Sequence, residues 1–164
     1  LRQPFIFIIL GYIKMNILEN IEFRPNQAVV FDIDDTLISS KNGQPITNIC
    51  NLYNYCRQKG YGMYIITARA GTPYGVKYTM QQLQQCGITG YKKLFFRPPL
   101  DMNVPLYKKN ARKSIPETVV MSVGDQPWDI GEYGGIGLIV RPPPQVRSYP
   151  AMLGNFFGRL VFTP

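Results

Sequence analysis

The sequence contains no histidine among its 164 residues. This absence excludes Ser-His-Asp triads, phosphatases with a histidine nucleophile, and metal sites built from imidazole ligands. Any catalysis by this chain must therefore use carboxylates, hydroxyls, thiols or amines.

Cysteine is scarce as well, with only Cys50, Cys56 and Cys86 in the chain. The number is odd and no pair has CxxC spacing, so neither a zinc site nor a disulfide framework is expected. We interpret the three side chains as small core hydrophobes. This cysteine usage predicts a reducing compartment, either the cytoplasm or another intracellular one. Secretion through an N-terminal signal is the alternative that the sequence leaves open.

Acidic residues are few, because ten Asp and Glu stand against eighteen Lys and Arg, for a formal charge of +8. The field of such a molecule attracts phosphorylated or otherwise anionic partners. With 45% apolar residues, the chain has enough material for one globular domain with a sizeable core. A second full domain does not fit.

The N-terminus carries an apolar run at residues 5–10 that is too short to span a bilayer as a helix, so no transmembrane span is predicted. No small-residue cleavage site follows the run before Lys14, which favours a buried or partner-docked strand over a signal peptide. Whether residues 1–14 belong to the mature protein stays open. The predicted division is an apolar extension at 1–24, a central domain at 25–141, and a tail rich in proline and aromatics at 142–164.

Apolar runs alternate with amphipathic segments along the central domain. Strands are predicted at 28–31, 62–66, 93–96, 118–123 and 136–140, and helices at 47–59, 72–86 and 106–115. Thr47 or Asn48 is the expected cap of the first helix. Alternation of this kind predicts an α/β fold, namely a Rossmann-like three-layer α/β/α sandwich with a mainly parallel central sheet. The Asn-Gly pair within residues 39–45 predicts a small flap over the end of the first strand.

Five of the ten acidic residues follow two of the predicted strands. Three come directly after the first strand and two after a later one: Asp32, Asp34, Asp35, Asp125 and Asp129. Such crowding is electrostatically costly unless a cation or a function compensates for it, and an ordinary acidic turn is the weaker explanation. If the two strands are neighbours, Asp32, Asp34 and Asp125 meet at one point, where their oxygens suit Mg²⁺.

These segments carry a family resemblance. Asp32-Ile33-Asp34-Asp35-Thr36 resembles the DxDxT signature of haloacid-dehalogenase-like (HAD) phosphatases, and Ile65-Ile66-Thr67-Ala68-Arg69 resembles the second motif of that family. Tyr107-Lys108 with Arg112 is similar to the third motif, and Gly124-Asp125 with Asp129 to the fourth. The third and fourth motifs are most similar to the acid-phosphatase-type branch, subfamily III. Pro127-Trp128 in the middle of the fourth motif departs from that branch.

The resemblance implies a Mg²⁺-dependent hydrolase of phosphate monoesters. In that scheme Asp32 is the nucleophile that becomes an aspartyl-phosphate, and Asp34 is the general acid and then the general base. Asp32, Asp34 and Asp125 would hold the metal. Thr67, Arg69 and Lys108 would bind the phosphate. Asp129 and Arg112 would support the site from outside the first layer of ligands, Asp129 by orienting Lys108 or a metal-bound water and Arg112 by stabilising the acidic cluster.

Helical geometry favours Lys108 over its neighbour Lys109 for the family's lysine. In a helix through residues 104–115, Val104, Tyr107, Ala111 and Ile115 form the buried stripe. Lys108 borders this stripe, whereas Lys109 points away from it. A solvent-exposed position for Arg112 is nearly as well supported as a role beside the acidic site.

The spacing between the motifs leaves no room for a cap domain, so the site is expected to be open to phosphorylated small molecules or macromolecular ends. Seven basic residues at 92–113, interleaved with aromatics, could contact nucleic acid, but an ordinary basic face over core aromatics is favoured. The alternative to an enzyme is a HAD-fold structural or binding subunit with an incidental site. Such a subunit could join a protein assembly through its N-terminal segment and C-terminal tail.

Overall fold

The computed structural model describes residues 5–9 and 22–141. Most of the predicted N-terminal extension and the whole predicted C-terminal tail lie outside the described residues. The proposed role of these two segments in an assembly therefore stays a prediction. In the part of the chain that is described, no helix is long and apolar enough to cross a membrane.

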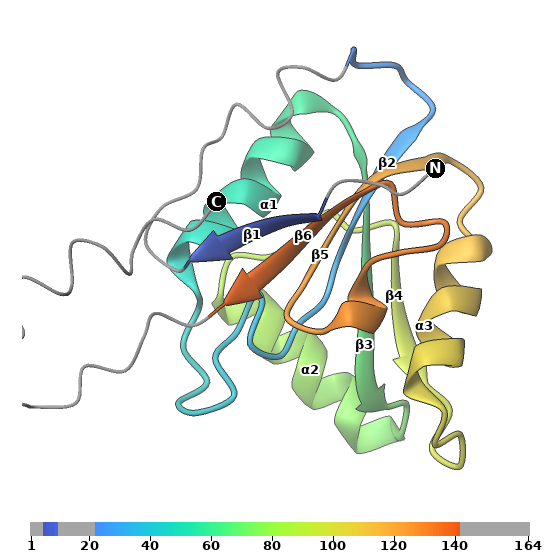
Figure 1. Ribbon diagram of the computed structural model, residues 1–164. Helices are drawn as coiled ribbons and strands as arrows, with labels where there is room; N and C mark the ends of the chain where they lie inside the picture. The colour runs from blue at the N-terminus through green and yellow to red at the C-terminus, as the bar shows by residue number, and fades with distance from the viewer. Residues whose placement is uncertain (1–4, 10–21, 142–164) are drawn as a thin grey trace, which may run out of the picture.

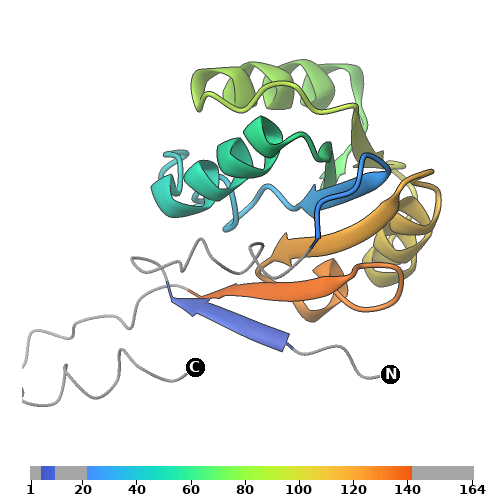
Figure 2. The same ribbon diagram turned by 90° about the horizontal axis from the view of Figure 1, so that it is seen from above.

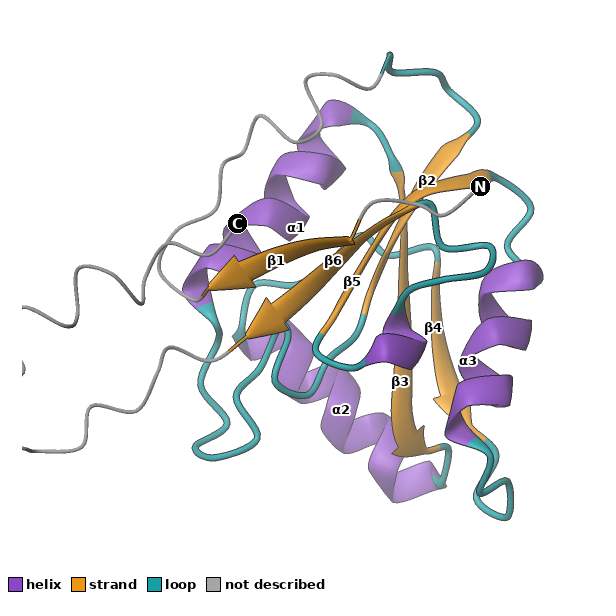
Figure 3. Cartoon of the chain, viewed as in Figure 1, coloured by secondary structure: helices purple, strands orange, loops and turns teal. Residues whose placement is uncertain are grey.

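The described chain alternates strands and helices, as expected (Figure 3). The strands are β1 Phe5–Ile9, β2 Gln27–Phe31, β3 Gly62–Ala70, β4 Lys93–Arg97, β5 Thr118–Gly124 and β6 Ile136–Arg141. The helices are α1 Thr47–Lys59, α2 Pro73–Gln85 and α3 Val104–Lys113, with a short 3₁₀ helix η2 at Pro127–Asp129.

The strands form one six-stranded sheet in the order β1-β6-β5-β2-β3-β4, and every neighbouring pair is parallel (Figure 1). The N-terminal apolar run thus contributes a strand, β1, at one edge of the sheet beside β6. The predicted α/β class and the mainly parallel sheet are confirmed.

The two faces of the sheet carry two separate cores, because successive side chains of a strand point to opposite sides. On β2, Val29 and Phe31 pack in the larger core with residues of α1 and α2, whereas Ala28 and Val30 pack in the smaller core with residues of α3. Figure 2 shows α1 and α2 together on one face and α3 on the other. This arrangement is the predicted three-layer sandwich.

The helix boundaries follow local capping. Asn103 caps α3 by accepting a hydrogen bond from the backbone N–H of Leu106, and Thr72 caps α2 in the same way through Gly75. The cap expected for α1 at Thr47 or Asn48 is wrong. The N-cap is Ile46, which makes no side-chain cap and whose carbonyl accepts from Ile49 and Cys50.

Within the described residues, no domain is inserted between the strands. A short loop links β2 to α1, closed by an antiparallel bridge between Ile38 and Pro45, and it corresponds to the predicted flap. The core is therefore capless over this range, as the sequence indicated.

Candidate active site

Asp32 follows β2 directly and is buried, with 6% of its surface exposed. Its backbone N–H donates to the carbonyl of Val123 at 2.9 Å, so the pairing of β2 with β5 continues to this residue. The Thr36 hydroxyl donates to Oδ2 of Asp32 at 3.2 Å. The carbonyl of Ile33 accepts from the backbone N–H groups of Thr36, Leu37 and Ile38. These bonds hold the Asp32 carboxylate at the carboxyl end of the sheet.

Lys108 reaches this carboxylate from α3. The Lys108 ammonium donates to Oδ1 of Asp32 at 2.8 Å and makes a very short ion pair with Asp129. Burial by itself lowers the pKa of Lys108, but Asp32 and Asp129 outweigh it and raise the pKa above its usual value. Lys109, the competing candidate, pairs with Glu132 near the surface. The structure brings Lys108, and not Lys109, to Asp32.

Asp129 lies on η2, where its Oδ2 accepts from the backbone N–H of Gln126 at 3.0 Å. Gly124 makes this position accessible, because a Cβ atom built on residue 124 would lie 2.1 Å from the Cβ of Asp129. Only glycine permits so close an approach. The end of β5 and the turn after it therefore bring Asp125 and Asp129 to the same place.

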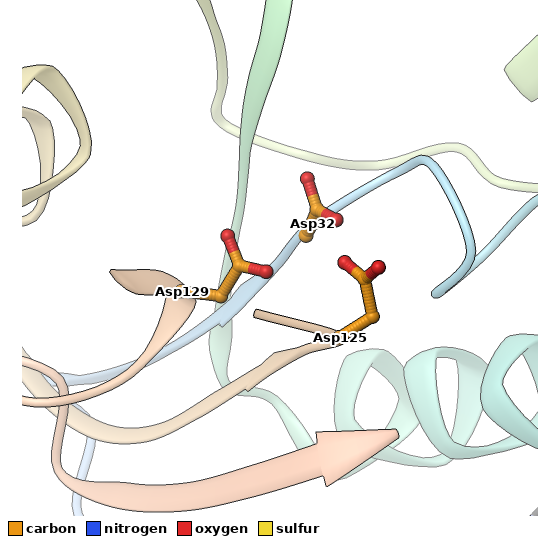
Figure 4. A group of neighbouring side chains, drawn as sticks. All are labelled: Asp32, Asp125 and Asp129. Atoms are coloured by element: carbon orange, nitrogen blue, oxygen red, sulfur yellow. The ribbon is translucent and has the colours of Figure 1, made fainter. Parts of the chain in front are cut away.

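Three carboxylates come together at this edge of the sheet, those of Asp32, Asp125 and Asp129 (Figure 4). One oxygen from each lies within 4.8 Å of the others. Burial raises the pKa of Asp32 well above its usual value, the charge of Asp129 raises it further, and Lys108 lowers it in part. Burial is also the main cause of the raised pKa of Asp125.

This donor set fits a hard divalent cation. Three carboxylates face one ammonium group in the cluster, so a Mg²⁺ ion would balance the remaining negative charge with the oxygen ligands that it prefers. The grouped residues differ from the predicted metal set in one member, because Asp129 stands where Asp34 was expected.

The Asp34 carboxylate is engaged by Arg69 from β3. Arg69 donates from Nε to Oδ2 at 3.0 Å and from Nη2 to Oδ1 at 2.7 Å, which is a bidentate ion pair. The remaining arm of the guanidinium, Nη1, donates to Thr79 at 3.1 Å and to Gln82 at 2.8 Å on α2. Arg69 thus links the first motif to α2.

Thr79 and Gln82 were missed by the sequence reasoning. They lie three positions apart on α2, so they share one face of the helix. Thr79 is 1% exposed. In the sequence it stands three positions after Val76 and four before Leu83, and a polar residue on that apolar stripe was the available signal.

Thr67 is fully buried on β3, two residues beyond the pairing of Ile65 with Phe31. Its hydroxyl oxygen accepts from the backbone N–H of Arg69 at 3.1 Å. The strand was expected to end at Thr67, but it continues through Ala70, and this extension carries Arg69.

Arg112 is 4% exposed, so it is not the solvated arginine that the sequence left open. Its guanidinium donates to the carbonyls of Trp128, Ile130 and Glu132 at 2.9, 3.4 and 3.4 Å. Burial lowers the pKa of Arg112. This residue therefore supports the turn that carries Asp129 through main-chain contacts, and the hydrogen bonds found for it include none to a site carboxylate.

The seven basic residues of the 92–113 region do not form one free patch. Lys108 and Arg112 are buried at the site, and Arg97 donates to four main-chain carbonyls. The other four contact acidic or aromatic side chains: Lys92 with Glu117, Lys93 with Phe95, Lys109 with Glu132 and Lys113 with Tyr133. Nucleic-acid binding through this region stays a prediction.

Comparisons with known proteins show a family match and a shared fold. Residues 38–147, more than half of the chain, match the sequence profile described as HAD superfamily, subfamily IIIB (acid phosphatase). The match contains Thr67, Lys108 and Asp125, whereas Asp32 and Asp34 precede it. No curated protein matches the chain significantly.

Solved structures share the fold. A chain of the Pnkp1/Rnl/Hen1 complex aligns with a TM-score of 0.59 at 17% identity, covering 76% of this chain and 48% of that one. The class C acid phosphatase from Bacillus anthracis aligns with a TM-score of 0.56 at 16% identity, covering 74% of this chain and 68% of that one. Its tungstate-bound form gives 0.54 at 17%, with the same coverage. The chain thus spans about half the length of the first of these structures.

Proposed function

The chain belongs to the HAD superfamily, subfamily IIIB (acid phosphatase), and from this premise we propose that it is a magnesium-dependent phosphomonoester hydrolase. The observation that carries the proposal is the contact of buried Asp32 with the Lys108 ammonium, beside the Asp125 and Asp129 carboxylates. A buried carboxylate at a strand end, flanked by a fixed cation, is suited to attack an anionic group.

Asp32 is the proposed nucleophile. One of its oxygens forms a bond to phosphorus while the bond from phosphorus to the leaving-group oxygen breaks in line, and Asp34 gives that oxygen a proton. Asp34 then takes a proton from water, which attacks the aspartyl-phosphate and releases inorganic phosphate. Asp32 is regenerated as a carboxylate.

Positive charge from the chain supports both steps. Lys108 stays protonated between Asp32 and Asp129 and neutralises charge on the transferring group. Asp32, Asp125 and Asp129 would hold Mg²⁺, which supplies charge neutralisation and orientation of the phosphate. Asp34 was also expected among the metal ligands. Its carboxylate is bonded to Arg69, so a contribution of Asp34 to metal binding stays a proposal.

Arg69 has two tasks in this scheme. Both oxygens of Asp34 accept hydrogen bonds from its guanidinium. An incoming phosphate competes for the same donors, so its binding would draw Arg69 away and leave Asp34 available for proton transfer. Thr67, at the end of the neighbouring strand, is the proposed hydroxyl donor to the phosphate.

The test is hydrolysis of a generic aryl phosphate by the purified protein with and without Mg²⁺. We expect activity that is lost with a chelator, and a loss of about 10³-fold or more in Asp32→Asn. Asp35→Asn is the matched control, because Asp35 is exposed and bonds Ser40 instead of the cluster. Absence of activity from folded protein with Mg²⁺ would contradict the proposal and favour a binding subunit.

A reducing cellular compartment remains part of the proposal. It rests on the three cysteines, which are free thiols, with Cys50 and Cys56 buried.

A further inference from the structure

Large apolar side chains are exposed around the carboxyl ends of the strands. Among the residues that the structure describes, eight of the nine exposed side chains of this kind belong to the segments after β3, β4 and β5. These segments begin at the carboxyl ends of their strands (Figure 1), and Asp32 follows the carboxyl end of β2 in the same parallel sheet. Two of the eight lie apart from the others, because Met80 lines a hollow beside α2 and Tyr133 contacts Lys113 at the end of α3. We call the other six the apolar rim: Tyr74, Tyr78, Leu100, Met102, Leu106 and Trp128. Single exposed apolar residues are ordinary, but their concentration beside a site marks an interaction surface.

Hydrogen bonds join the segments that carry the rim. The backbone N–H of Gly71, just before α2, donates to the carbonyl of Arg97 at 2.8 Å. Arg97 in turn donates from Nε to the carbonyl of Ala68 at 2.9 Å. The loop that leads to Tyr74 and the loop that carries Leu100 are therefore held side by side.

The loop after β4 is fixed in place although its apolar side chains face solvent. Nη1 of Arg97 donates to the carbonyls of Pro98, Pro99 and Asp101 at 3.3, 3.3 and 2.8 Å. Leu100 is nevertheless 95% exposed and Met102 82% exposed. A preorganised loop that presents apolar groups loses little conformational entropy when a partner covers them.

The rim is continuous with the candidate active site through α2. The rings of Tyr74 and Tyr78 stack with centroids 6.2 Å apart and an angle of 13° between their planes. Thr79, which follows Tyr78 on α2, accepts a hydrogen bond from Nη1 of Arg69 at 3.1 Å. The helix that carries two of the rim residues is therefore bonded to the arginine that holds Asp34.

We propose that the apolar rim binds apolar side chains flanking a phosphorylated residue in a peptide segment of another protein, while the phosphate enters at Asp32. This inference rests on the proposed function, because it takes the cluster around Asp32 as the phosphate site. In the described residues no inserted domain covers the site, so an extended segment can lie across it.

The charges near the rim favour a peptide over a nucleic acid. A polynucleotide needs several cations aimed at successive phosphates. Arg97 is engaged by main-chain carbonyls and Lys109 by Glu132. Lys77 lines a separate hollow between α2 and residues 88–91, which it shares with Met80.

The test compares the binding of two labelled phosphopeptides of equal length and charge to Asp32→Asn protein with Mg²⁺. One peptide has Leu and Phe beside the phosphoresidue and the other has Ser and Gly. We expect the apolar peptide to bind about tenfold more tightly, and Leu100→Ser/Met102→Ser to remove most of that difference. Met80→Ser is the matched control, because Met80 is 48% exposed on α2 but lies outside the rim, and we expect it to preserve the difference.

Equal affinity for the two peptides would contradict the proposed role of the rim. An unchanged difference in affinity between the two peptides in the Leu100→Ser/Met102→Ser variant would contradict it as well. Tighter and steeply salt-dependent binding of a 5′-phosphorylated oligonucleotide also overturns it, in favour of nucleic acid. The assay uses protein without the proposed nucleophile, so its result is separate from aryl phosphate turnover. Loss of turnover in the wild type with the peptide preference intact would contradict the proposed function and not the rim.

Discussion

The Lys108 ammonium lies 2.8 Å from Oδ1 of Asp32, although 76 positions separate the two residues in the chain. The contact crosses from α3 on one face of the sheet to the end of β2 in its middle. It brings a fixed positive charge to the proposed nucleophile.

Replacing Lys108 with methionine tests the buried charge. Asp32 and Asp129 would lose their shared cation, so we expect a loss of about 3–5 kcal/mol in the free energy of unfolding, measured by denaturant titration without metal. Addition of Mg²⁺ should recover part of the loss. Lys109→Met, which breaks only the surface pair with Glu132, should change stability little. An equal effect of the two substitutions would contradict the assigned geometry.

Gly124→Ala tests the close approach of Asp129 to β5. The added methyl group would displace Asp129 and, with it, the short contact to Lys108. We expect destabilisation of about 1–3 kcal/mol and a fall of about 10–100-fold in aryl phosphate turnover.

A double-variant cycle with Asp129→Gly, which removes the Cβ atom of residue 129 as well as its carboxylate, separates this contact from a general defect of the strand. The two losses of stability should be markedly less than additive, because the clash needs the Asp129 side chain. Additive losses would show that the glycine acts on something else.

Gln82→Ala tests the support of Arg69 from α2. Gln82 accepts from Nη1 of Arg69 at 2.8 Å, so its loss leaves that arm of the guanidinium with Thr79 as its only partner among the hydrogen bonds described. We expect KM for aryl phosphate to rise about threefold to tenfold with a smaller change in kcat, as for a lost hydrogen bond to a charged group. Gln81→Ala, an exposed neighbour, is the control and should leave both constants unchanged. A fall in kcat alone would contradict a role in binding the phosphate.

The carboxylate cluster predicts how stability depends on pH without a divalent cation. Burial raises the folded-state pKa of Asp32 and of Asp125 above the unfolded value, so the folded protein binds more protons than the unfolded chain in the interval between the two values. The contribution of these groups to stability is therefore present below the unfolded pKa of about 3.9 and is lost as pH rises through the folded-state pKa.

Mg²⁺ should reduce this loss, because binding to the ionised carboxylates compensates for their repulsion. Thermal unfolding across pH, with Mg²⁺ and with a chelator, measures the difference. The two curves should separate progressively as pH rises. Curves that stay parallel would argue against a metal at these carboxylates.

Much of the architecture followed from local pattern. The apolar runs that became β2, β3 and β5 each end where polar side chains of the site begin, and parallel strands place such ends together. The apolar stripe of α3 distinguished Lys108 from Lys109, because the face of a helix on which a residue lies depends only on the helical period. The missing cap domain could be predicted from the number of residues between the motifs.

Other features could not be predicted in this way. The predicted cap of α1 was wrong. Thr47 and Asn48 are both residue types that cap helices well, but the path of the bridged loop before the helix makes Ile46 the N-cap. The partners of Arg69 depend on how α2 packs against β3, and no local pattern contains that packing.

The sequence by itself determined that this chain is an α/β protein with its carboxylates at strand ends, because strand period, helix period and motif spacing are local properties. Only the tertiary structure decided which carboxylates share one place. Asp129 lies beside Asp32 and Asp125 because Gly124 has no side chain to keep it away. Asp34 is paired with Arg69 instead. The physical reason is that ion pairs and metal-type clusters depend on side-chain positions fixed by contacts between distant segments.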